Sequence, residues 1–82
     1  MHYKPSGICA VGIDFEVVDG KVADVVFTGG CDGNHKGLNA LIKGMSVDEA
    51  IERLRGITCG PRNTSCPDQL SKALESYKNG QV

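Results

Sequence analysis

Four cysteines have the most distinctive chemistry in this chain of 82 residues. They are Cys9, Cys31, Cys59 and Cys66, and six residues separate the last two. Thiols can pack as small hydrophobic groups, form disulfides, take part in thiol exchange or bind a soft metal ion. The N-terminal sequence MHYKPSG lacks the apolar region of a signal peptide,. We therefore expect a reducing, cytoplasmic location, where metal binding or redox chemistry is favoured over a disulfide framework.

A β-hairpin is predicted to position the first two cysteines. Residues 9–18 alternate between apolar and polar types, Asp19-Gly20 is typical of a two-residue turn, and residues 21–28 form the return strand,. A hairpin returns the end of its second strand to the start of its first, so we expect Cys9 and Cys31 to be neighbours. The predicted inward residues are Val11, Ile13, Phe15, Val17, Ala23, Val25 and Phe27.

A glycine-rich loop and an amphipathic helix follow the hairpin. Gly29, Gly30 and Gly33 indicate positive φ angles or a close approach of the backbone to another group,. A helix is expected from Asn34 or His35 to Gly44, and His35 is expected to be an exposed first-turn residue rather than a ligand,. The predicted apolar stripe of this helix is Leu38, Leu41, Ile42 and Met45.

Two further helices have clear start signals. Residues 46–49 (SVDE) form a capping box for a helix that Gly56 ends,. The last helix is expected to begin at Ser65 or Cys66, because Pro67 suits a first turn and the charge of Asp68 suits the helix dipole, and to end at Asn79-Gly80,. Their predicted inward residues are Val47, Ala50, Ile51 and Leu54, then Leu70, Ala73, Leu74 and Tyr77.

These elements predict a single α+β domain over residues 1–82, with three helices packed on one face of an antiparallel hairpin,. Two strands alone are marginally stable, so a third strand from residues 3–8 or from a partner is expected. A domain of this size has a small core and commonly needs a disulfide or a metal as additional support.

The same arrangement predicts a four-cysteine site. If the last helix begins at the open end of the hairpin, the sulfurs of Cys9, Cys31, Cys59 and Cys66 converge. A helix N-terminus favours a thiolate, the form that binds metals. We expect zinc or an iron–sulfur cluster there, although the chain has no Cys-x-x-Cys pair,. The alternative is that Cys59 and Cys66 alternate between dithiol and disulfide.

Composition excludes other classes of function. Nine basic and ten acidic residues give a net charge of −1, and no basic run is present, so nucleic-acid binding is not expected,. The apolar stretches are much shorter than a membrane span,. No nucleophile–base pair is visible, so the sequence predicts no catalytic residue.

Several motifs resemble those of the TSCPD-domain family. They are TSCPD at residues 64–68, GGCDGN at 29–34, LIKG at 41–44 and GITC at 56–59, and the likeness extends over residues 3–78. The family includes short stand-alone proteins and a domain at the C-terminus of adenosylcobalamin-dependent ribonucleotide reductases. The resemblance implies that Cys9, Cys31, Cys59 and Cys66 are metal ligands and that the chain is an accessory module linked to ribonucleotide reduction and DNA synthesis.

A looser likeness is to the U-type scaffold proteins of iron–sulfur cluster assembly. It rests on the order of cysteines and elements and on KGMSVDEA at residues 43–50. It implies a similar fold, ligand positions at Cys9, Cys31 and Cys66, and a role in cluster delivery as an alternative function. A ribonucleotide reductase, or an iron–sulfur or redox protein, is the partner that these resemblances imply.

Overall fold

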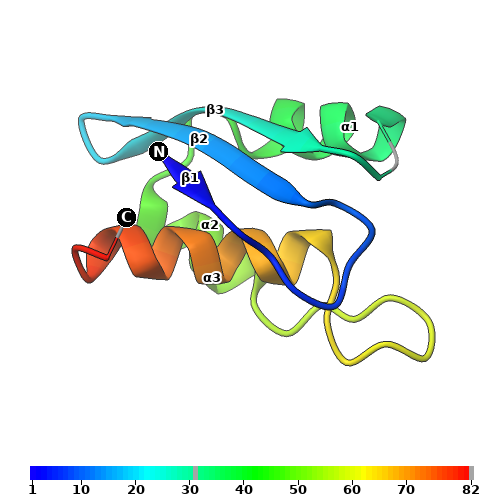
Figure 1. The fold of residues 1–82 in the computed structure, drawn as a ribbon. Helices are drawn as coiled ribbons and strands as arrows, with labels where there is room; N and C mark the ends of the chain where they lie inside the picture. Colours follow the sequence, from blue (N-terminus) through cyan, green and yellow to red (C-terminus); the bar gives the residue numbers. More distant parts are fainter. Residues whose placement is uncertain (31, 82) are drawn as a thin grey trace.

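A three-stranded antiparallel sheet organises the computed structural model, which describes residues 1–30 and 32–81. The strands are β1 (His2–Tyr3), β2 (Gly12–Val18) and β3 (Lys21–Thr28), in that order across the sheet. Asp19 and Gly20 join β2 to β3 with φ angles of 53° and 76°, as the predicted two-residue turn requires,. The expected third strand is therefore β1, which the N-terminal segment forms with residues 2–3 (Figure 1).

A β-bulge changes which residues of the hairpin face the core. Val17 pairs with Val22 while Glu16 pairs with Asp24, so Ala23 is an extra residue in β3,. The alternation shifts at that point: Val22 is buried and Ala23 is only half-buried, contrary to the prediction. Val11 was also predicted wrongly, since β2 begins one residue later and its side chain is 68% exposed. Ile13, Phe15 and Val25 are buried as expected.

Helix α1 (Asp32–Ile42) lies along the outer edge of β3. The Asn39 side chain accepts a hydrogen bond from the backbone N–H of Val25 and donates one to Asp24, at 3.0 Å each. These bonds fix the rotation of α1, which turns Ile42 into the core and leaves Leu41 76% exposed. The prediction that Leu41 faces inward was therefore wrong.

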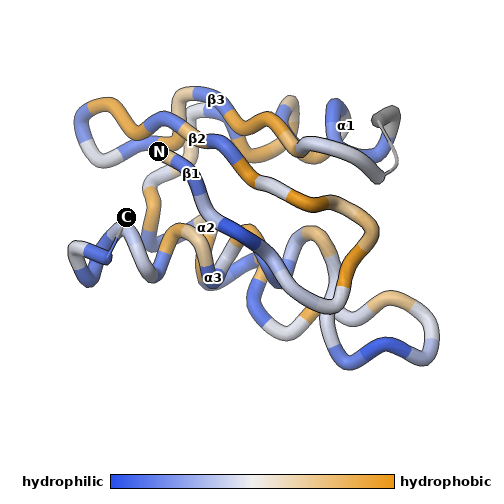
Figure 2. The backbone as a smooth tube through the Cα atoms, viewed as in Figure 1, coloured by the Kyte–Doolittle hydropathy of each residue, from blue (hydrophilic) through white to orange (hydrophobic). Residues whose placement is uncertain are grey.

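Helices α2 (Val47–Leu54) and α3 (Cys66–Lys78) pack against each other on one side of the sheet (Figure 1). Both begin as predicted: the Ser46 and Ser65 hydroxyls accept hydrogen bonds from the N–H groups of Glu49 and Asp68,. The hydrophobic residues gather along the strands and on the helices facing them (Figure 2). All three helices contribute to one core, which confirms the α+β class. Its buried residues are Ile13, Phe15, Val22, Val25, Ile42, Val47, Ala50, Ile51, Leu54, Leu70, Ala73 and Leu74.

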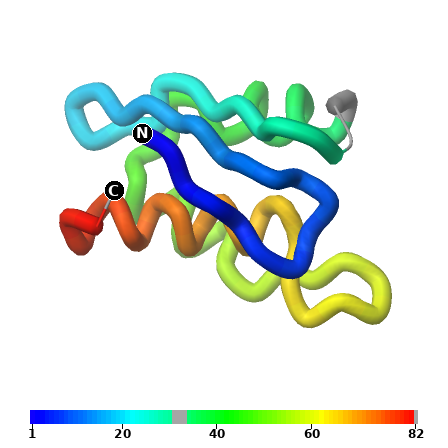
Figure 3. Tube along the Cα trace, in the orientation of Figure 1, coloured from blue at the N-terminus to red at the C-terminus, as the bar shows by residue number. Residues whose placement is uncertain are grey.

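The N-terminal segment links the sheet to the start of α3. After β1 it descends past α3, turns near the beginning of that helix, and rises into β2 (Figure 3). The Ser6 N–H donates to the side chain of Gln69 (3.1 Å), and Arg62 donates to the carbonyl of Gly7 (3.2 Å). No helix in the described ranges 1–30 and 32–81 has the length and apolar character to cross a bilayer.

Candidate functional site at the start of helix α3

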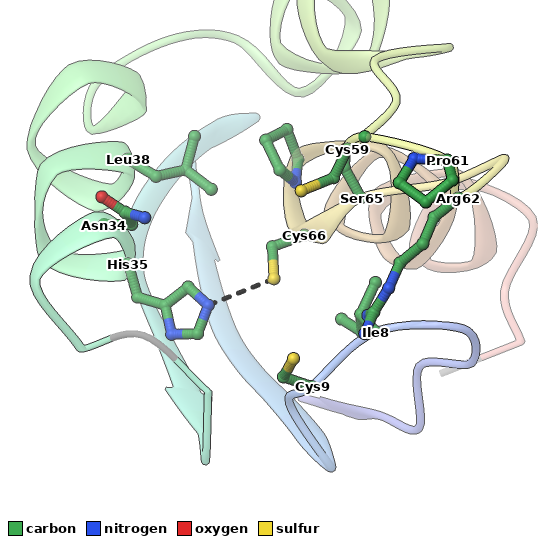
Figure 4. Close-up of a pocket in the computed structure, with 12 residues that line it drawn as sticks. Ile8, Cys9, Asn34, His35, Leu38, Cys59, Pro61, Arg62, Ser65 and Cys66 are labelled. Carbon is green, nitrogen blue, oxygen red and sulfur yellow. Dashed lines mark hydrogen bonds between the residues drawn. The ribbon is translucent and has the colours of Figure 1, made fainter.

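A pocket of about 530 Å³ lies where the N-terminal segment, α1 and α3 meet (Figure 4). Its wall is formed by residues 8–9, by Asn34, His35 and Leu38, by residues 59–62 and by residues 65–67. Three cysteines, Cys9, Cys59 and Cys66, therefore come from three separate segments to one pocket. The three described cysteines thus line one pocket, and Cys31, the fourth residue that was expected there, lies outside the described residues.

The open end of the hairpin places Cys9. The N–H of Val11 donates to the carbonyl of Thr28 (2.8 Å), which holds the start of one strand beside the end of the other. A Cβ atom built on Gly29 would lie 3.6 Å from the carbonyl oxygen of Cys9. The glycine loop therefore passes close to Cys9, in agreement with the close approach that its glycines predicted.

Cys66 is the first residue of α3, and the residues around it hold it there. Ser65 caps the helix and donates its hydroxyl hydrogen to the carbonyl of Ile57 (2.6 Å). Thr64 donates to one carboxylate oxygen of Asp68 (2.5 Å), and the other oxygen accepts from the N–H of Gly56 (2.8 Å). These bonds tie the loop after α2 to the first turn of α3 and hold the backbone on either side of Cys66.

His35 faces the pocket, although the sequence predicted an exposed residue. It is 7% exposed, because α1 begins at Asp32 and its inner face contains His35, Leu38 and Ile42. Its ring stacks on Phe27 with centroids 4.1 Å apart. Its Nε2 atom lies 3.2 Å from the sulfur of Cys66, within hydrogen-bonding distance (Figure 4). The spacing of His35 from Leu38 and Ile42, at i+3 and i+7, was the sequence signal for this position.

The three described cysteines are thiols and form no disulfide. Cys9 and Cys59 are exposed, and Cys66 is half-buried. Within the described part of the chain, no three His, Cys, Asp or Glu side chains are already gathered closely enough to hold a metal ion. The donor groups thus surround one pocket without forming a finished coordination site.

The family model described as "TSCPD domain" matches residues 1–78. This chain belongs to the TSCPD-domain family. Comparison with curated proteins and with solved structures gave no match.

In this TSCPD domain, the motif residues Thr64, Ser65 and Asp68 have structural roles. They are almost fully buried, and their hydrogen bonds hold the loop and helix on either side of Cys66. Gln69 extends the network, since its amide donates to Thr64 (2.9 Å) and accepts from the N-terminal segment. Cys66 is the residue of the motif whose reactive atom faces the pocket.

Asp68 carries a negative charge inside this network. The hydrogen bond from Thr64 lowers the pKa of Asp68 most, followed by the bond from the Gly56 N–H,. Burial acts in the opposite direction, and the Lys72 ammonium, 3.9 Å away, again lowers the pKa of Asp68. The carboxylate therefore stays ionised near neutral pH and accepts hydrogen bonds on both oxygens.

Proposed function

We propose that this TSCPD domain is a metal-binding module that holds zinc or an iron–sulfur cluster with the cysteines of its pocket. The observation that carries the proposal is that Cys9 lines the same pocket as Cys59 and Cys66, although it lies fifty positions before Cys59 in the sequence. Cys31, the other predicted ligand, lies outside the described residues.

The donor chemistry around the pocket fits such a metal. Thiolate and imidazole are the ligands that zinc prefers in structural sites, and thiolates hold iron–sulfur clusters. Because the described donors surround the pocket without being gathered, binding requires rotation of exposed side chains such as Cys9. When bound, the metal would link the N-terminal segment to the start of α3 and add to the stability of a small core.

A metal with this structural role suits an accessory or partner-binding module better than an independent enzyme. The family likeness to the C-terminal domain of ribonucleotide reductases supports a partner of that class, or an iron–sulfur or redox protein, in the cytoplasm. On this proposal the metal stabilises the surface that the partner recognises, and catalysis belongs to the partner.

Anaerobic purification followed by metal analysis and absorption spectroscopy tests the proposal. About one equivalent of zinc per chain, or the visible absorption of an iron–sulfur cluster, is the expected result. Less than about half an equivalent of any metal, with every thiol titratable in the native state, would overturn it. A cluster that is lost readily to an acceptor protein would instead indicate a delivery scaffold.

A thiol redox module is the second candidate, favoured by the exposure of Cys59 and its place in the same pocket as Cys66. Oxidation would remove two electrons and two protons from the two thiols and form one S–S bond, while the disulfide of a partner protein is reduced to two thiols. A reversible Cys59–Cys66 disulfide in a chain that folds without metal would support this candidate over the first.

A further inference from the structure

We infer that His35 is a ligand of the metal through its Nε2 atom, together with Cys9 and Cys66, and that Cys59 is outside the coordination sphere. The inference rests on the proposed function and specifies its ligands. It departs from the four-cysteine set that the sequence predicted, because a nitrogen donor replaces one sulfur.

The position of His35 relative to Cys66 is the first reason. The 3.2 Å between Nε2 and the Cys66 sulfur is shorter than the separation of two ligands on a tetrahedral zinc ion, about 3.5 Å for bonds of 2.0–2.3 Å,. A small increase in this distance is sufficient to place a metal between the two atoms. In Figure 4 the sulfur of Cys9 points toward the same space from the opposite wall.

The ring of His35 is also held in a fixed orientation. Phe27 stacks on it with an angle of 18° between the two planes. On another side, the backbone of Gly30 approaches so closely that a Cβ atom there would lie 2.8 Å from Cε1 of His35. A buried ring with restricted rotation loses little conformational entropy when it binds a metal.

Cys59 has neither property. It lies in the loop between α2 and α3, where residues 55–63 are all exposed. In Figure 4 its side chain lies beyond Cys66, near Ser65, and does not face His35. A neutral imidazole in place of this thiolate also leaves one negative charge fewer for Arg62, the basic residue of the pocket wall, to compensate,.

X-ray absorption at the zinc edge tests the inference on the wild-type chain loaded with one equivalent of Zn²⁺. The expected spectrum contains an imidazole nitrogen shell beside the sulfur shell. That nitrogen shell should persist in Cys59→Ser and in His2→Ala, the control for the other histidine, and should disappear in His35→Ala. Competition with a chelator should show that His35→Ala weakens zinc binding by more than about 100-fold. Loss of a residue that only hydrogen-bonds to a ligand typically weakens binding by about 10–100-fold, so a larger loss indicates a direct ligand.

The outcomes separate the two proposals. A sulfur-only shell, with zinc affinity lost in Cys59→Ser, overturns the role of His35 and leaves the metal site intact. Failure of the wild-type chain to bind zinc or iron overturns the proposed function as well. If His35→Ala does not fold, the wild-type spectrum still decides the ligand set, and His35→Gln provides a second variant with a polar side chain.

Discussion

The Thr64 hydroxyl donates a 2.5 Å hydrogen bond to the carboxylate of Asp68, and Cys66 lies between these two residues in the sequence. The bond closes the first turn of α3 onto the loop that precedes it. The backbone position of Cys66 therefore depends on a buried polar network around it.

Replacing Asp68 by asparagine should destabilise the domain by about 1.5–3 kcal/mol at pH 7, the range for hydrogen bonds to charged groups. The folded-state pKa of Asp68 is below its unfolded value. The carboxylate thus contributes stability above about pH 4, and this stability is lost as the pH falls through the folded-state pKa. Urea unfolding at several pH values should show a smaller acid-induced loss in Asp68→Asn than in the wild type.

Asp48 provides the control for this variant. Its ion pair with Lys78 is exposed, so Asp48→Asn should change the free energy of unfolding by less than about 1 kcal/mol,. Equal losses in Asp48→Asn and Asp68→Asn would contradict a special role for the network around Cys66.

Replacing Gly30 by alanine should displace the His35 ring. Gly30 has φ = 77° and its new Cβ atom would meet the ring at 2.8 Å, whereas Gly20 has φ = 76° and open space around it. An alanine with a positive φ angle destabilises the fold by about 1–2 kcal/mol, in Gly30→Ala and equally in the control Gly20→Ala. Gly30→Ala should lose a further amount of similar size, because its Cβ atom crowds the His35 ring. The stacked Phe27 ring shifts the NMR signals of the His35 ring protons. These chemical shifts should change in Gly30→Ala and stay the same in Gly20→Ala. Unchanged chemical shifts in Gly30→Ala would mean that the His35 ring does not lie against Gly30.

Leu74 and Leu41 should respond very differently to truncation. Leu74 is fully buried in α3, so Leu74→Ala should lower the free energy of unfolding by about 2–5 kcal/mol,. Leu41 is 76% exposed, so Leu41→Ala should change it by no more than about 0.5 kcal/mol,. Thermal unfolding monitored by circular dichroism compares them directly. A large loss in Leu41→Ala would mean that α1 is rotated relative to the described position.

Zinc should raise the melting temperature of the wild-type chain but not that of Cys66→Ser. A ligand present at 1,000 times its Kd stabilises the folded state by about 4 kcal/mol through mass action. Calorimetry with and without zinc measures this difference, and the two metal-free chains serve as controls for the substitution itself. Equal stabilisation of both chains would exclude Cys66 from the site.

Local signals were sufficient to predict most of the elements. The hydroxyl caps at Ser46 and Ser65 and the turn at Asp19 act over a few residues, so their patterns identified the correct positions. Ala23 was misplaced because a bulge shifts the alternation without leaving a mark in composition. Leu41 was misplaced because Asn39 sets the rotation of α1 through bonds to another strand, which helix periodicity does not contain.

The site could be predicted in part for a similar reason. The topology of the hairpin and the start of α3, which Pro67 marks, were enough to predict that Cys9 and Cys66 lie near each other, and both line one pocket. His35 was missed because it is a polar residue at a position of the inward-facing stripe, and its burial depends on Phe27, on the neighbouring strand.

The contacts that close the pocket have a consequence for synthesis of the protein. Ser6 bonds to a residue 63 positions later in the chain, and Gly7 bonds to one 55 positions later. While the chain is still being made on the ribosome, Cys9 emerges long before α3 can complete the other wall. The pocket can be completed only after Gln69 has left the exit tunnel. On the proposed function, metal can load at the complete pocket only after Gln69 has emerged from the ribosome.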